Sequence, residues 1–97
     1  MKYVLVKWNH NFADEPVLLY SEIDDARWEV RKVEIYRDGR SGYASAAESA
    51  GSTRLGEVPV PSLADIATDP QFVPLEITAE EFERVWRAAL GDEHPNR

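Results

Sequence analysis

A strongly marked amphipathic segment near the C-terminus sets the tightest limit on the fold. Thr78 followed three residues later by Glu81 forms a capping box, and Ile77 and Phe82 have the spacing of a hydrophobic staple. Apolar residues then recur at helical intervals on one face: Phe82, Val85, Trp86, Ala89 and Leu90. Gly91 is a typical helix stop. A helix with such a stripe needs an apolar surface to cover it.

The N-terminal half predicts strands that can supply this surface. Residues 2–10 alternate between a more apolar and a more polar face, and segments 17–23 and 27–37 are rich in β-branched and aromatic residues. Asp38-Gly39 predicts a two-residue hairpin turn, because this pair readily takes positive φ at both central positions. An antiparallel sheet is therefore expected.

The third of these segments, 27–37, changes the phase of its alternation. Its early apolar residues stand at even positions and its later ones at odd positions, on either side of Arg31-Lys32. Either a bulge at this dipeptide re-aims the strand, or both faces of the sheet are partly covered. We favour the bulge.

The predicted fold class is α+β. We expect an antiparallel sheet of about four strands, with Tyr43 on the last, covered on one face by the C-terminal helix. Residues 1–91 form a single domain in this interpretation, and the small polar residues of 44–56 form a mobile loop. Ser62 caps a short helical turn, and the tail 92–97 frays.

Charge and cysteine content narrow the classes of function. The 97 residues include 18 acids, 11 bases and no cysteine, for a net charge of −7. Such a field repels phosphate backbones, so we expect a basic protein partner and no nucleic acid, although 27–40 is locally basic. Without cysteine there is no disulfide, thiolate metal site or catalytic thiol. The N-terminus resembles neither a signal peptide nor a membrane span, so we expect a cytoplasmic protein without membrane contact.

The sequence contains none of the common phosphate-binding, nucleophile-elbow or zinc-protease motifs. We therefore expect no cofactor or metal, and a non-enzymatic role is favoured over an enzymatic one. His10 has carboxylates close by in the sequence, and a histidine oriented by a carboxylate can act as a general base. A surface position explains His10 as well. The loops, turns and returning strand give these candidate residues for contact with a partner: His10, Asp14, Glu15, Asp24, Asp25 and Tyr43.

Four stretches carry a resemblance to a known family. They are 15–25, 27–39, 55–61 and 77–86, and the run WEVRKVE within the second is the most specific. Together they resemble a family of small bacterial proteins, common in actinobacteria, that is known as a domain of unknown function. The resemblance implies no activity and no catalytic residue. A looser likeness to proteins that confer immunity to toxins extends only to size and acidity.

Three hypotheses remain open. The first is a non-enzymatic binding or regulatory protein, immunity-like in kind, that uses its acidic surface against a basic partner. The second is a small-molecule or enzymatic site near His10 and the loop 11–15. The third is a dimerising structural module, so that both a monomer and a homodimer are compatible with the sequence. Because the C-terminal helix covers one face of the sheet, we expect the functional surface on the opposite face or the loops.

Overall fold

A computed structural model describes residues 1–91 and contains one antiparallel sheet of six strands in the order β5-β4-β3-β2-β1-β6. The strands are β1 (Lys2–Trp8), β2 (Leu18–Ile23), β3 (Glu29–Ile35), β4 (Ser41–Ser45), β5 (Ser49–Ala50) and β6 (Phe72–Glu76). The helices are α1 (Leu63–Ile66) and α2 (Ala79–Leu90). The α+β class and the antiparallel sheet are confirmed, whereas the prediction of about four strands is inexact.

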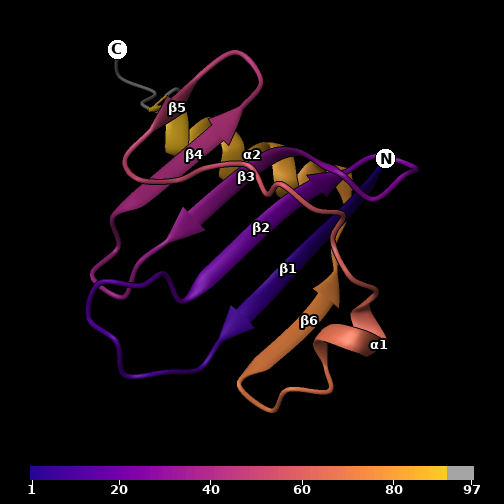
Figure 1. Ribbon diagram of the computed structural model, residues 1–97. Coiled ribbons are helices and arrows are strands. Elements are labelled where there is room, and N and C mark those ends of the chain that lie inside the picture. Colours follow the sequence, from indigo (N-terminus) through magenta and orange to yellow (C-terminus); the bar gives the residue numbers. More distant parts are fainter. Residues whose placement is uncertain (92–97) are drawn as a thin grey trace.

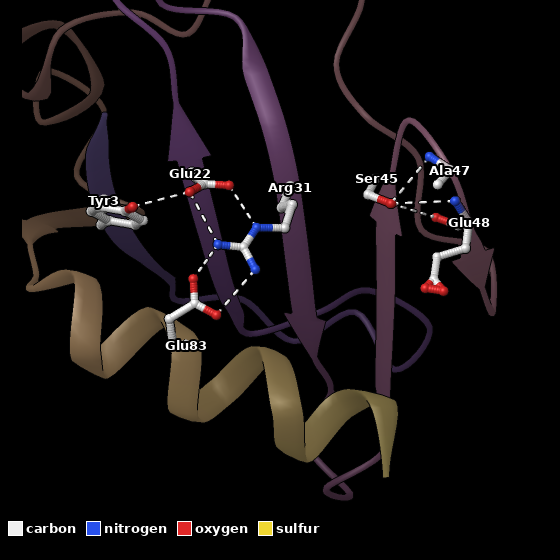
Figure 2. Close-up of polar contacts among 7 residues, drawn as sticks. All are labelled: Tyr3, Glu22, Arg31, Ser45, Ala47, Glu48 and Glu83. Carbon is white, nitrogen blue, oxygen red and sulfur yellow. Dashed lines mark hydrogen bonds and ion pairs between the residues drawn. The ribbon is translucent and has the colours of Figure 1, made fainter. Parts of the chain in front are cut away.

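The two strands that the sequence did not predict both lie at edges. Pro74 stands in the middle of β6, where a missing N–H is tolerated because only one side of an edge strand is paired. At the other edge, Ser45 closes a tight turn into β5. Its hydroxyl accepts hydrogen bonds from the backbone N–H groups of Ala47 and Glu48, each at 3.2 Å (Figure 2).

The hairpin between β3 and β4 has a longer turn than predicted. Gly39 has a φ of 92°, but Asp38 does not enter the positive region, so the two-residue turn is wrong. Instead, Tyr36 and Arg40 close the loop through the N–H of Tyr36 and the carbonyl of Arg40, 2.9 Å apart. The loop therefore needs positive φ at the glycine alone.

The register between β2 and β3 shifts where Glu22 pairs with Arg31 and Ile23 pairs with Glu29. Val30 is the extra residue, so the bulge lies one residue before the predicted dipeptide. As expected, the bulge re-aims the side chains of the strand. Beyond the bulge, residues 31, 33 and 35 face α2, and residues 32 and 34 face the opposite side of the sheet.

The main core lies between α2 and the sheet. Val33, Phe82 and Trp86 are buried there, and the rest of the predicted stripe packs around them. The capping box is confirmed, since Thr78 Oγ1 accepts from the N–H of Glu81 and Glu81 Oε1 accepts from the N–H of Thr78. This face of the sheet is called the helix face below.

The opposite face is covered by a strap, residues 51–61, that runs from β5 across the sheet to α1 beside β6 (Figure 1). We call this the strap face. The predicted loop 44–56 is thus divided among the end of β4, β5 and the first half of the strap. Its mobility stays a prediction, and the predicted fraying of 92–97 lies outside the described residues.

Candidate functional site

His10 follows β1 in a long loop and is held by that loop's own backbone. Its Nδ1 accepts a hydrogen bond from the N–H of Phe12 at 2.9 Å, so the proton lies on Nε2, which donates to the carbonyl of Pro16 at 2.8 Å. Both ring nitrogens are therefore engaged with the backbone. The centroid of its ring also lies 4.2 Å from that of Trp8. His10 therefore organises the loop.

The other two candidates in this loop, Asp14 and Glu15, are exposed. They line a surface hollow of about 370 Å³ together with Trp8 and Phe12. His10 lines a neighbouring hollow of about 490 Å³ on the other side of Trp8. The loop thus brings the three predicted residues near one another, but the histidine nitrogens bond the backbone and not the carboxylates.

The remaining candidates lie elsewhere. Asp24 and Asp25 occupy the turn at the other end of β2, where Asp24 Oδ1 accepts from the N–H groups of Ala26 and Trp28 at 2.9 Å. Tyr43 lies on the helix face of β4, edge-on to the indole of Trp86 with 5.4 Å between ring centroids. The predicted residues therefore occupy three separate places, and Asp24 and Tyr43 have evident structural roles.

A buried polar network on the strap face was missed by the sequence reasoning. Glu29 accepts from the hydroxyl of Ser21 at 2.8 Å and from the N–H of Gly56 at 2.6 Å. Lys32 lies 3.4 Å from a carboxylate oxygen of Glu29 and donates to a strap carbonyl, that of Arg54, at 3.2 Å. The side chains of Glu29 and Lys32 are only 7% and 16% exposed. These charged side chains of β3 therefore fasten the strap to the sheet.

Close approach of the strap to the sheet also depends on a glycine. Thr53 of the strap is 1% exposed and donates to Glu34 Oε1 at 2.8 Å. A Cβ at Gly42 of β4 would lie 2.2 Å from the hydroxyl oxygen of Thr53. Only glycine at this position lets the strap lie so close to β4.

Arg27 fastens the second half of the strap. Its backbone carbonyl accepts from the N–H of Val60 at 2.7 Å, and its guanidinium donates to the carbonyls of Val60 and Pro61, both at 2.7 Å. The residue has a φ of 69°, a left-handed conformation that costs a non-glycine residue roughly 1–2 kcal/mol. The turn thus holds a strained residue in a position where it binds the strap at three points.

Between the fastened strap, α1 and the sheet lies an open groove of about 370 Å³. Its lining is mainly apolar: Val6, Leu19, Val60, Pro61, Ile66 and Phe72. Its polar lining is Ser21, Glu29 and Lys32 from the network, and Asp65 and Asp69 from α1 and the segment that follows it. Pockets of this size and composition are typical of ligand-binding sites, so the groove is the strongest candidate site.

The helix face has a polar network of its own, centred on Arg31 (Figure 2). Its guanidinium binds the carboxylates of Glu22 and of Glu83 on α2, and it lies 4.9 Å from the ring centroid of Phe82. The hydrogen bonds from Arg31 lower the pKa of both carboxyls. Burial, followed by the hydrogen bond to Glu22, raises the pKa of the Tyr3 hydroxyl. This network links β1, β2, β3 and α2.

Within residues 1–91, no group of three or more histidine or acidic side chains is arranged to hold a metal ion. The helices of this part of the chain are all too short or too polar to cross a membrane.

Sequence signals for the groove were weak. Its lining comes from β1, β2 and the segment 60–72, which carries no motif. The charges at the alternate positions of β3 were visible, but alternation alone does not distinguish a solvated face from one that holds a second layer of chain. The phase change in residues 27–37 had two explanations. The second, that both faces of the sheet are partly covered, allowed for such a layer.

The structure is a small α+β fold with α2 packed on one face of the sheet and the strap and groove on the other. The chain belongs to the family described as a domain of unknown function (DUF6881), whose model matches residues 2–91. This confirms the expected membership of an unknown-function family. The search of curated proteins and the search of solved structures each found no match.

Proposed function

We propose that this protein is a non-enzymatic binding module that uses its acidic surface to hold a basic protein partner. The observation that carries the proposal is how the charges are used. Each of the basic side chains in the locally basic stretch binds within the protein, to a backbone carbonyl or a carboxylate: Arg27, Arg31, Lys32, Arg37 and Arg40. The partly buried Arg31 and Lys32 are therefore not free to bind a phosphate, and Arg27, Arg37 and Arg40 each have a partner within the protein.

The exposed carboxylates are used differently. Among residues 1–91, these exposed acids make no ion pair: Asp14, Glu15, Asp25, Glu48, Glu57, Asp65, Glu76 and Glu80. Within residues 1–91 these acids outnumber the exposed bases that make no ion pair, which are Lys2, Lys7, Arg37, Arg54, Arg84 and Arg87, so the surface offered to a partner is acidic on balance. Charge complementarity of this kind steers association and suppresses like-charged partners.

The role we propose is that of a bacterial, cytoplasmic regulatory or immunity-like protein. Three observations support this role: the domain is small and acidic, its family has no assigned activity, and His10 has no catalytic arrangement around it. A toxin or other basic protein encoded beside it is the partner to try first.

The test is a binding measurement with a defined partner. The tagged protein is cross-linked in its native host, the recovered partner is identified and purified, and the affinity is measured by calorimetry at about 50 mM and about 300 mM salt. We expect a basic partner whose affinity falls at least tenfold at the higher salt. A partner bound equally well at both salt concentrations contradicts the proposal.

A small-molecule site beside His10 is the second candidate, and the hollow of about 490 Å³ next to Trp8 favours it. Its test is a fragment screen by NMR, with chemical-shift changes expected in the loop 9–17 that are lost in Trp8→Ala. Fragments that leave this loop unperturbed argue against it.

Dimerisation is the third candidate function. An added strand is disfavoured at β6 by Pro74, so a dimer would bury the exposed apolar side chains of Val73 and Leu75. Sedimentation of a monomer at high concentration excludes it.

A further inference from the structure

The groove combines an apolar lining with an unmatched negative charge. At its inner end, Lys32 lies between the carboxylates of Glu29 and Glu34, at 3.4 and 3.9 Å, and its remaining contact is a backbone carbonyl. At its rim, Asp65 and Asp69 form no ion pair within residues 1–91. No cation of the groove is therefore left to attract an anion, whereas the rim carboxylates can attract a cation.

The groove is also held open by polar contacts that do not depend on an occupant. The bonds from Arg27 to Val60 and Pro61, and from Gly56 to Glu29, fix the wall formed by the strap. A wall that is ordered before binding lowers the entropy lost on association. The apolar floor, including Val6 and Leu19, belongs to the central strands β1 and β2.

From this arrangement we propose that the groove is the anchor site for the protein partner, and that it takes an apolar side chain flanked by lysine or arginine. The apolar side chain lies against Val6, Ile66 and Phe72, and the flanking cation meets Asp65 and Asp69. The inference rests on the proposed function, because it assigns the acidic binding surface to one place. An acidic or wholly polar segment does not fit, since it leaves either the carboxylates opposed or the apolar floor uncovered.

The probes are three capped pentapeptides that share glycine ends. The first has the central sequence lysine-leucine-lysine, the second lysine-serine-lysine and the third glutamate-leucine-glutamate. Each is titrated into the whole protein and followed by 1H–15N correlation spectra. Burying a leucine side chain is worth about 1.5–3 kcal/mol, which corresponds to at least a tenfold change in affinity. We expect the first peptide to bind at least tenfold more tightly than the serine control, and more tightly than the glutamate control, whose charge is repelled by Asp65 and Asp69, with shifts at Val6, Leu19 and Ile66.

Two charge-matched variants locate the site. Asp65→Asn with Asp69→Asn removes the rim charge, and Asp14→Asn with Glu15→Gln removes the same charge from the exposed loop after β1. Both pairs are exposed or half-exposed, so each variant is expected to fold. The first variant should lose the preference for the lysine peptide over the glutamate peptide, and the second should keep it.

The outcomes separate this inference from the proposed function. Equal binding of all three peptides, or shifts confined to the loop 9–17, overturns the groove as anchor site. If the two variants weaken the lysine peptide equally, the acidic surface binds cations in general and the groove assignment is wrong, while the proposed function stands. If the natural partner binds the Asp65→Asn, Asp69→Asn variant as tightly as the wild type, the groove is not its anchor site, while the proposed function stands. If the groove binds the lysine-leucine-lysine peptide but no basic partner exists, the proposed function fails, and the groove keeps only its preference for an apolar side chain flanked by cations.

Discussion

Replacing Arg31 by methionine tests whether the charged network on the helix face holds α2 to the sheet. Methionine retains much of the apolar contact with the rings of Phe82 and Trp86 but removes the cation. The side chain of Glu22 is only 9% exposed, so it would be left buried without its main partner. Glu83 is 39% exposed and would be resolvated at little cost.

The expected loss follows from these exposures. Removing one partner of a buried ion pair costs about 3–5 kcal/mol, and the partial exposure of Arg31 and Glu83 places this case at the lower end, about 3 kcal/mol. For a domain of this size each kcal/mol lowers the melting midpoint by roughly 4–8 °C, so the expected fall is about 12–24 °C. Thermal and urea denaturation followed by circular dichroism measure it.

Arg40→Met is the matched control. Arg40 is 66% exposed and pairs with Asp38 at the surface, so the same chemical change should shift the melting midpoint little. A second control is Glu22→Gln in the Arg31→Met background, which removes the stranded buried charge and should recover part of the loss. If Arg31→Met melts within about 3 °C of the wild type, the network contributes too little for this reasoning to hold.

The pH dependence gives an independent check on the same network. The ordinary carboxyl pKa is 4.5, and in the folded protein Arg31 lowers the pKa of Glu22 and Glu83. A lowered folded pKa contributes stability that is present above the ordinary pKa and is lost as the pH falls through the folded pKa. Without the cation, burial raises the pKa of Glu22 and reverses the sign of its contribution. The difference in unfolding free energy between wild type and Arg31→Met should therefore be full near neutral pH and shrink as the pH falls, first through the raised pKa of Glu22 in the variant and then through the lowered pKa values of the wild type. A difference that is constant with pH refutes this assignment.

Three further substitutions test the two covers of the sheet. Trp86→Ala should cost about 3–5 kcal/mol in urea denaturation, because it empties a buried aromatic position under α2, and an unchanged midpoint would remove α2 from the core. Gly42→Ala should cost about 1–3 kcal/mol, because its Cβ would meet Thr53, and faster hydrogen exchange at Gly56 would show that the strap has moved. Thr78→Ala should cost about 1 kcal/mol in thermal melts through loss of the N-cap, whereas Thr78→Ser should be close to neutral.

The parts of the fold that were predictable have local causes. The helix limits follow from Thr78, Glu81 and Gly91, whose contacts or backbone conformation depend on near neighbours in sequence. The edge strands were not predictable in this way. β6 contains Pro74, which is acceptable only because β1 pairs with it from one side. The edge position of β6 follows from the strand order of the whole sheet, so the five residues of β6 do not predict it.

The groove was not predictable for a related reason. His10 and the acids around it were chosen because reactive residue types stood close together in sequence, but the nitrogens of His10 bond backbone groups of the same loop. The groove joins Val6 to Ile66 and Phe72 across some sixty residues of chain. Apolar residues at such separation look like core positions until the topology shows that nothing covers them. The broader expectation, a functional surface on the face away from the helix or in the loops, stays a prediction, and the groove lies on that face.

The bulge at Val30 connects the two halves of this structure. By shifting the phase of β3, it turns Arg31 toward α2 and leaves Lys32 and Glu29 to hold the strap, so adjacent residues in one strand fasten opposite covers. A charge on a strand face is costly to bury unless it is paired, and both sides of β3 meet that condition with carboxylates or carbonyls. The helix cover is held mainly by aromatic packing, whereas the strap is fastened mainly by polar contacts and borders a groove with a mainly apolar lining. The same strand therefore holds the helix on one face of the sheet and the strap that borders the groove on the other.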